Sequence, residues 1–115
     1  MFVTIVESPE YHKKSKTLLG EEESQALINY LAQNPQAGDV IQGTGGVRKI
    51  RWGRPGQGKR GGVRVIYYYY NDVFPIFMLT LFAKNEQENL SKADCNELAK
   101  LTKILLKTYT QGNLL

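Results

Sequence analysis

The sequence has 115 residues, of which 42% are hydrophobic and 23% charged, with a net charge of +4. These values exclude a disordered chain and predict one folded domain over residues 1–115. The single cysteine, Cys95, excludes an intramolecular disulfide, and the apolar run at residues 2–6 is too short for a signal peptide or a membrane span, so we expect a cytoplasmic protein without membrane contact.

The N-terminal third predicts a strand and two helices. The first apolar run is rich in β-branched residues, which is typical of a strand. Ser8 and Pro9 suit the start of a helix that runs to about Leu19 and stops at Gly20. Three consecutive glutamates then open a second helix, where they favour the positive end of its dipole, and Asn34-Pro35 ends it.

Three further strands and a C-terminal helix follow. Apolar and β-branched runs at residues 47–52, 63–70 and 74–83 predict strands, and the last two should form an antiparallel hairpin around Asn71-Asp72. The run at 63–70 is continuously apolar, as in a central strand covered on both sides. Ser91 can cap a final helix with leucines at three- and four-residue spacing. The expected fold class is α+β, in the order β-α-α-β-β-β-α, with helices on one face of a mostly antiparallel sheet.

Positive charge gathers in the middle of the chain. Between Asp39 and Asp72 there is no acidic residue. Solubilising surfaces normally mix the two signs, so this segment predicts a surface that binds a polyanion. The segment holds seven cations: Arg48, Lys49, Arg51, Arg54, Lys59, Arg60 and Arg64.

The second predicted strand has two different faces. Lys49 and Arg51 share one face, whereas Ile50 and Trp52 share the other. One face can therefore meet a ligand while the other packs. Trp52 and the tyrosines at 67–70 could stack on bases, although most residues of a central strand belong to the core.

Two glycine-rich segments fail as nucleotide-binding motifs. Residues 53–59 have P-loop spacing, but Arg60 stands where a metal-binding serine or threonine is needed, and a strand follows instead of a helix. Residues 43–46 lack the third glycine of a dinucleotide fingerprint. His12 is the only histidine, and no Cys/His spacing fits zinc. We therefore expect no cofactor, no metal, and proton transfer without imidazole.

Three segments together resemble toxins of the RelE/ParE superfamily, in its HigB-like branch. They read VIQGTGGVRKIR at residues 40–51, GKRGGVRVIYY at 58–68 and AKNE at 83–86. The resemblance implies the RelE-like fold and a toxin that cleaves messenger RNA in the ribosomal decoding site. It also implies a partner, a cognate antitoxin with a DNA-binding domain, that silences the toxin.

The resemblance also implies which residues form the site. Asn85 stands where many members carry a further arginine, and Ser91 where a catalytic tyrosine can follow. The other cations of the middle segment are expected to bind RNA or the ribosome: Arg48, Arg54, Lys59 and Arg60. Four residues correspond to the catalytic cluster: Lys49 and Arg51 on the second predicted strand, Arg64 at the exposed start of the third, and Lys84 at the end of the fourth.

The chemistry of RNA cleavage agrees with these residue types. Attack by the 2′-hydroxyl requires removal of its proton, stabilisation of a negatively charged phosphorane and protonation of the 5′-oxygen. Cations stabilise the phosphorane, and a lysine crowded by positive charges releases its proton more readily. Lys49 or Lys84 is therefore the expected general base or acid, with Arg51 and Arg64 on the scissile phosphate and Glu86 as an alternative base.

Two other functions stay open at this point. A ParE-like inhibitor of DNA gyrase would share the fold without needing the basic cluster, and a non-catalytic RNA- or ribosome-binding domain would use the cluster for binding alone. The antitoxin could mask the cluster, or dock on the first two helices and block entry to the ribosome. The resemblance favours the second mode.

Overall fold

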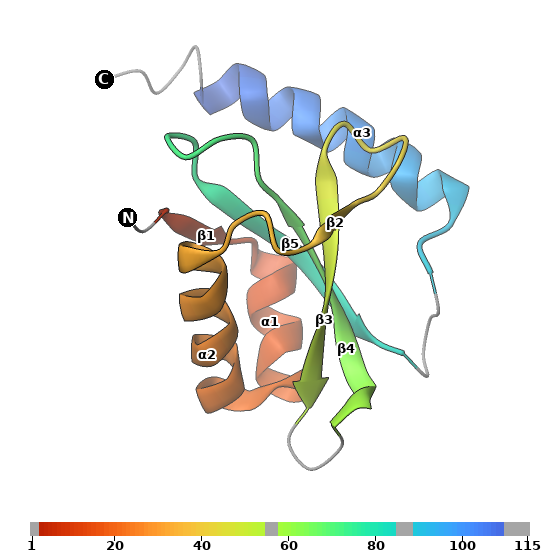
Figure 1. Cartoon of the computed structure of the whole chain (residues 1–115). Helices are drawn as coiled ribbons and strands as arrows, with labels where there is room; N and C mark the ends of the chain where they lie inside the picture. Colours follow the sequence, from red (N-terminus) through yellow and green to blue (C-terminus); the bar gives the residue numbers. More distant parts are fainter. Residues whose placement is uncertain (1–2, 55–57, 85–88, 110–115) are drawn as a thin grey trace.

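Three helices and a five-stranded sheet make up the part of the chain that the structure describes, a computed structural model covering residues 3–54, 58–84 and 89–109 (Figure 1). The order matches the predicted one except for β2, whose two residues are too few to show a periodic pattern. In chain order the elements are β1 (Ile5–Glu7), α1 (Pro9–Leu18), α2 (Gly20–Gln33), β2 (Asp39–Val40), β3 (Val47–Arg54), β4 (Gly58–Tyr68), β5 (Ile76–Ala83) and α3 (Lys92–Lys107).

The sheet has the strand order β1-β5-β4-β3-β2. β1 runs parallel to β5, whereas the other three pairs are antiparallel. The predicted hairpin of β4 and β5 is confirmed. Asn71 holds its turn, because its Oδ1 accepts hydrogen bonds from the backbone N–H groups of Val73 and Phe74 at 2.9 and 2.7 Å. The α+β class with a mostly antiparallel sheet is therefore confirmed.

The helices cover both faces of the sheet, so the expectation of helices on one face is wrong. Val63, Val65 and Tyr67 of β4 pack with residues of α1 and α2. Ile66 and Tyr68 of the same strand pack instead with residues of α3. Because β4 is apolar on both faces, leaving either face in water would forfeit burial worth roughly 25 cal/mol per Å². Figure 1 shows α3 crossing the sheet well away from α1 and α2.

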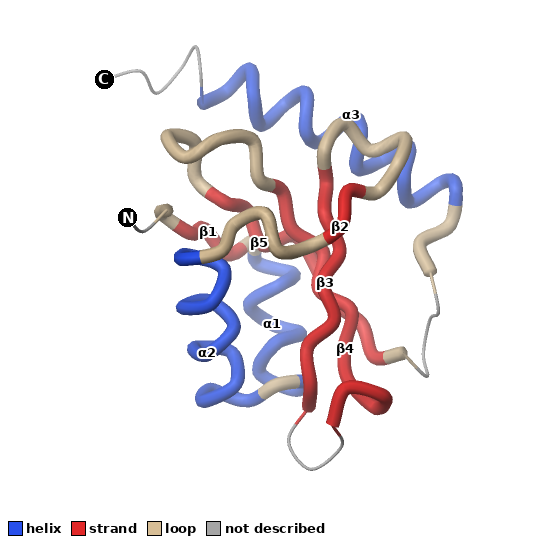
Figure 2. The backbone as a smooth tube through the Cα atoms, in the orientation of Figure 1, coloured by secondary structure: helices blue, strands red, loops and turns tan. Residues whose placement is uncertain are grey.

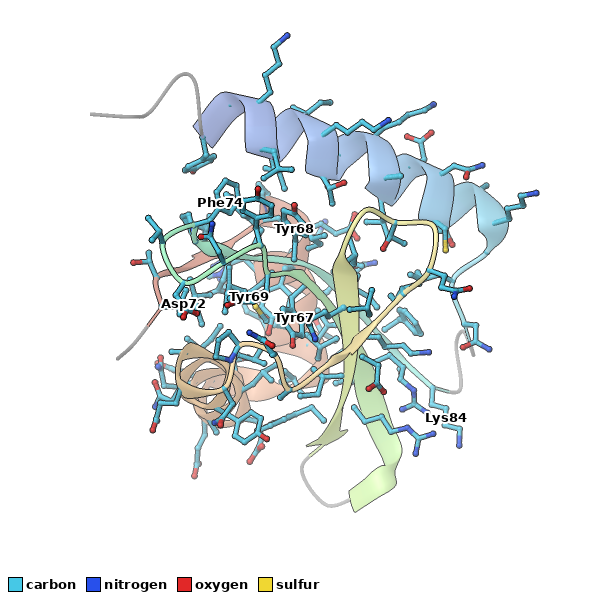
Figure 3. All side chains as sticks on the ribbon, turned by 45° about the horizontal axis from the view of Figure 1, so that its top comes forward. Tyr67, Tyr68, Tyr69, Asp72, Phe74 and Lys84 are labelled. Atoms are coloured by element: carbon cyan, nitrogen blue, oxygen red, sulfur yellow. The ribbon has the colours of Figure 1, made fainter. Side chains whose placement is uncertain are left out.

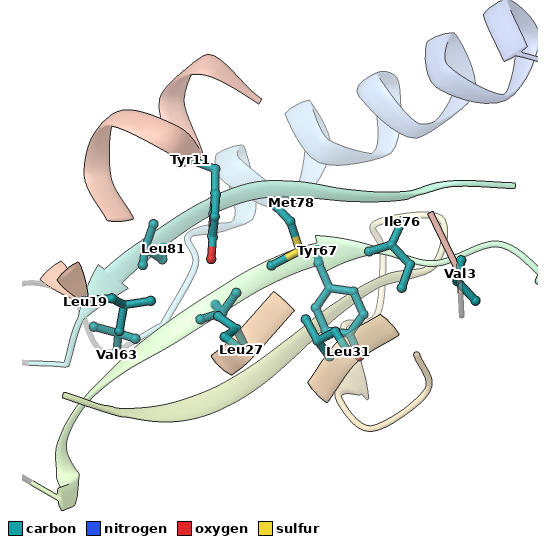
Figure 4. Packing of buried hydrophobic residues seen from close by; sticks show 11 residues of the cluster. Val3, Tyr11, Leu19, Leu27, Leu31, Val63, Tyr67, Ile76, Met78 and Leu81 are labelled. Carbon is teal, nitrogen blue, oxygen red and sulfur yellow. The ribbon is translucent and has the colours of Figure 1, made fainter. Parts of the chain in front are cut away.

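The first core lies between α1, α2 and the sheet (Figure 4). Tyr11 of α1 and Leu27 and Leu31 of α2 are fully buried there. Leu27 and Leu31 lie four residues apart, so they face the sheet from the same side of the helix. Ile76 and Met78 of β5 meet them from the sheet, and both are fully buried. This packing fixes α2 beside β3.

Both predicted serine caps are present. Ser8 accepts a hydrogen bond from the N–H of Tyr11 at 3.0 Å, and its hydroxyl donates to the carbonyl of Leu79 at 2.9 Å. Ser91 and Asp94 form a reciprocal capping box, with bonds of 3.0 and 3.1 Å. Each cap contributes about 1 kcal/mol to its helix. The caps fix where α1 leaves the sheet and where α3 begins.

The glycine-rich segment before β3 docks on α3. The buried Thr44 accepts a bond from the N–H of Val47 at 3.1 Å, and its carbonyl accepts one from the Thr102 hydroxyl of α3 at 3.2 Å. Gly45 has φ +80°, and a Cβ there would lie 2.6 Å from Oγ1 of Thr102. Only glycine fits this position. The segment therefore serves to hold α3 over one half of the sheet.

Tyr67 anchors the segment that leads from α2 into β2. Its ring is fully buried, its hydroxyl accepts from the N–H of Gly38 at 2.8 Å, and it donates to the carbonyl of Pro35 at 2.9 Å. Burial raises the pKa of the Tyr67 phenol above its ordinary value. The folded state therefore favours the neutral phenol.

Tyr67→Phe is expected to lower the free energy of unfolding by about 1–3 kcal/mol, because it leaves the buried N–H of Gly38 without an acceptor. Urea unfolding at neutral pH measures this loss.

The neutral phenol of Tyr67 stabilises the fold fully below the ordinary tyrosine pKa of about 10, and this contribution is lost as the pH rises through the raised pKa. Stability should thus fall less steeply at alkaline pH in Tyr67→Phe than in the parent. Tyr70→Phe, at an exposed tyrosine, is the matched control, and equal stability of all three proteins would contradict the anchor.

Candidate functional site

Four basic residues line one open cleft of about 990 Å³ on the sheet. We call these four residues the cationic cluster. Two come from β3, one from β4, and one directly follows β5. They are Lys49, Arg51, Arg64 and Lys84, the four residues that the sequence singled out.

The cluster lies on the half of its sheet face that α3 leaves open. In the register of β3 and β4, Val47 pairs with Tyr68, and both pack with residues of α3. Further along the same pair of strands, Lys49 is opposite Ile66, and Arg51 is opposite Arg64. Because side chains alternate, these positions share one face. The face is therefore apolar under α3 and cationic beyond it.

Arg64 lies in the middle of β4 and is only 5% exposed. The expectation that it opens a strand at an exposed position is therefore wrong, since β4 begins six residues earlier, at Gly58. Arg51 is its direct cross-strand partner and is exposed. Like charges directly opposite one another destabilise a sheet, and an anion bound between them would relieve that repulsion. The pair is thus suited to hold a phosphate.

The two lysines of the cluster differ in their surroundings. Lys49 is half-buried, and its Nζ donates to Oδ1 of Asn89 at 3.3 Å, which ties it to the segment before α3. Lys84 is exposed just after β5, and its backbone N–H donates to the carbonyl of Gly62 at 3.3 Å. Figure 3 shows Lys84 on the side of the molecule away from Tyr69 and Asp72.

Three members of the cluster make no ion pair within the described residues. They are Lys49, Arg51 and Lys84, and the surface ion pairs His12–Glu7, Lys14–Glu10 and Lys100–Glu97 lie elsewhere, on β1, α1 and α3. Asp39 is the register partner of Lys49 across β2 and β3, and it lines the same cleft. The described lining of the cleft therefore carries four cations against two carboxylates, Asp39 and Glu23, and this excess of positive charge suits a polyanion.

Of the other predicted RNA-binding cations, Arg48 has a described side chain, and it does not join the cluster. Arg48 faces the opposite side of β3, where its Nη1 donates to the carbonyls of Gly38 and Gln36 at 2.8 and 3.3 Å. Its guanidinium lies 5.8 Å from the ring centre of Tyr69. It holds the segment before β2, so its RNA contact stays a prediction. The side chains of Arg54, Lys59 and Arg60 lie outside the described residues, as does all of Glu86.

Several cleft residues had no signal in the sequence. Glu23 and Tyr30 come from α2, and Asp39 comes from the unpredicted strand β2. Asn89 precedes α3 and reaches Lys49. None of these residues belongs to a motif, because each is brought to the cleft by the packing of its element. Only the position of Asp39 at the border of the basic segment could have hinted at its role.

The described residues contain no group of three or more histidine, cysteine, aspartate or glutamate side chains arranged to hold a metal ion. No described helix is long and apolar enough to cross a membrane.

Two comparisons with known proteins bear on the chain. Residues 10–114 match the family model described as the RelE toxin of the RelE/RelB toxin-antitoxin system. The structure is also similar to that of E. coli toxin RelE, solved as an arginine-to-alanine double mutant in the free state. That match has a TM-score of 0.57 and 15% sequence identity, and it covers 89% of this chain and 98% of that chain. At this identity the structural likeness concerns the fold.

Proposed function

The chain belongs to the RelE toxin family, and from this we propose that it is a ribosome-dependent endoribonuclease of the HigB-like branch. It cleaves messenger RNA in the decoding site through the 2′-hydroxyl of the substrate and so inhibits translation in the cytoplasm. An antitoxin is the partner that the family implies.

The observation that carries the proposal is the meeting of the cationic cluster in one cleft. Its four residues come from three separate segments of the chain, on β3, on β4 and directly after β5, and the sheet brings them together. A surface that only keeps a protein soluble has no need of two arginines in direct cross-strand register. Phosphoryl chemistry does need such an arrangement, because the transition state carries more negative charge than the substrate.

The proposed roles follow from position. Arg51 and Arg64 face each other across β3 and β4 and hold the scissile phosphate from two sides. Lys49 is held by Asn89 and, as general base, accepts the proton of the 2′-hydroxyl while the 2′-oxygen forms its bond to phosphorus. The bond between phosphorus and the 5′-oxygen then breaks, and Lys84, exposed just after β5, stabilises the negative charge on this leaving oxygen until water protonates it. Metal ions have no part in this mechanism.

Dependence on the ribosome fits the chemistry of the cleft. Its described lining contains no histidine, so its own capacity for proton transfer near neutral pH is weak. Orientation of the messenger by the ribosome would compensate for this weak proton transfer, because a fixed geometry of the reacting groups lowers the entropic part of the activation barrier. A protein that inhibits gyrase would not require the cationic cluster.

Primer extension on a messenger RNA after induction of the protein tests the proposal. We expect discrete cuts within codons, and their loss when translation of that messenger is blocked. DNA damage without cuts would favour the gyrase inhibitor. Ribosome binding without either effect would favour a non-catalytic binding domain.

A further inference from the structure

We propose that Trp52 and Tyr30 form a base-stacking platform beside the cationic cluster. The platform holds one nucleobase of the RNA strand whose phosphate lies between Arg51 and Arg64. This inference rests on the proposed function, because it assigns a second subsite to the same RNA strand. It gives the cleft a means to select bases as well as phosphates.

The edge of β3 joins the two subsites. On the outer side of β3, β2 pairs only with Arg48 and Lys49, so from Ile50 onward no described strand borders this edge (Figure 2). The cleft accordingly reaches side chains of both faces of β3, with Arg51 on one face and Trp52 on the other. A ligand that lies along the edge can contact both faces.

The two aromatic rings lie together at this edge. The ring centres of Tyr30 and Trp52 are 5.5 Å apart, with an angle of 50° between the ring planes. Tyr30 is 42% exposed and Trp52 is half-buried, and both line the cleft. An aromatic pair that packs against the protein on one side and is exposed to solvent on the other offers a surface on which a base can stack, as in proteins that bind single-stranded nucleic acid.

Glu23 positions the indole ring. Its Oε1 accepts a hydrogen bond from Nε1 of Trp52 at 3.0 Å. Glu23 and Tyr30 are seven residues, or about two helical turns, apart on α2, so they lie on the same side of the helix and meet Trp52 from there. The bond fixes the plane of the indole, which reduces the entropy lost when a base stacks on it.

Charge separates the two subsites. The carboxylate of Glu23 repels a phosphate from the aromatic side of the edge, whereas Arg51 and Arg64 attract it to the other side. The base and the phosphate of a nucleotide project in different directions from the ribose, so one nucleotide or two adjacent ones can satisfy both subsites. A single strand of RNA fits this division, because its bases are free to stack.

Fluorescence of Trp52, the only tryptophan in the chain, tests the platform directly. The probe is a short 2′-O-methyl oligoribonucleotide, which cannot be cleaved through its 2′-oxygen, and binding is followed in parallel by the anisotropy of a dye on the probe. We expect the probe to quench the indole emission as it binds. An abasic probe of the same length should bind through its phosphates with little quenching.

Variants of the exposed tyrosine separate stacking from folding. Tyr30→Ala should weaken binding of the probe about tenfold and leave binding of the abasic probe unchanged. Tyr30→Phe keeps the ring and should bind as the parent does. Tyr70→Ala, at an exposed tyrosine outside the cleft, is the matched control. Binding without quenching, together with unchanged affinity of Tyr30→Ala, would overturn the platform.

Cut patterns in cells give a second measurement, which also applies if the free probe binds too weakly to follow. Tyr30→Ala should change which codons are cut, because a base of the messenger is read. Unchanged cuts in Tyr30→Ala would overturn the platform. Cuts weakened equally at every codon would also overturn it, because the stacked base would then belong to ribosomal RNA and not to the messenger. Quenching by RNA in a protein that makes no cuts would instead refute the proposed nuclease and leave the platform standing.

Discussion

Arg64→Ala should reduce messenger cleavage by about a hundredfold or more and abolish growth arrest. Arg64 is buried in the wall of the cleft, directly across from Arg51, so its guanidinium needs little reorganisation to meet a developing charge. Loss of one such preorganised donor typically costs a factor of 100 to 1000 or thereabouts in rate. Single-turnover cleavage on programmed ribosomes measures the effect.

Because Arg64 is buried, the fold of the variant must be checked by its thermal unfolding. Arg64→Lys keeps the charge but loses the two-pronged contact with phosphate, so it should retain only part of the rate. Lys103→Ala removes one positive charge from the exposed side of α3 and should cleave normally. Normal growth arrest by a well-folded Arg64→Ala protein would refute the role of Arg64.

Lys49→Arg is expected to slow cleavage by about a hundredfold, because arginine keeps the positive charge but does not release a proton near neutral pH. Lys49 is the better candidate for proton transfer than Lys84, since it is half-buried and its Nζ is held 3.3 Å from Oδ1 of Asn89. A held group reaches the reacting atom with less loss of entropy. The dependence of the single-turnover rate on pH should also change in this variant.

The same substitution at the exposed lysine, Lys84→Arg, is the matched control. It preserves the charge near the leaving oxygen and should lower the rate only slightly. If Lys84→Arg were the slower protein, and Lys49→Arg kept the pH dependence of the parent, proton transfer would belong to Lys84.

Much of the secondary structure could be predicted from the sequence because its signals are local. Ser8 and Ser91 mark the starts of helices through bonds to N–H groups three residues on. Asn71 closes its turn within three residues. The apolar run of β4 predicted a central strand that is covered on both faces. The position of α3 agrees with this prediction and contradicts our expectation that all helices lie on one face.

The cationic cluster could be predicted only in part. Alternation along β3 placed Lys49 and Arg51 on one face from the sequence alone. Register is a property of two strands, so the pairing of Arg51 with Arg64 could not be read from either strand. The burial of Arg64 also depends on the strands on both sides of it, so the predicted position at an exposed strand end was wrong.

By itself, the sequence determined the kind of chemistry: a run of cations without acidic neighbours, no usable imidazole and no ligand spacing for a metal. Only the tertiary structure decided where that chemistry can act. The docking of Thr44 on Thr102 holds α3 over one half of a sheet face and leaves the other half open as a cleft. The packing of α2 against the sheet then brings Glu23 and Tyr30 to Trp52. These contacts join residues far apart in the chain, and such contacts depend on the shape and packing of whole elements, which local sequence patterns do not encode.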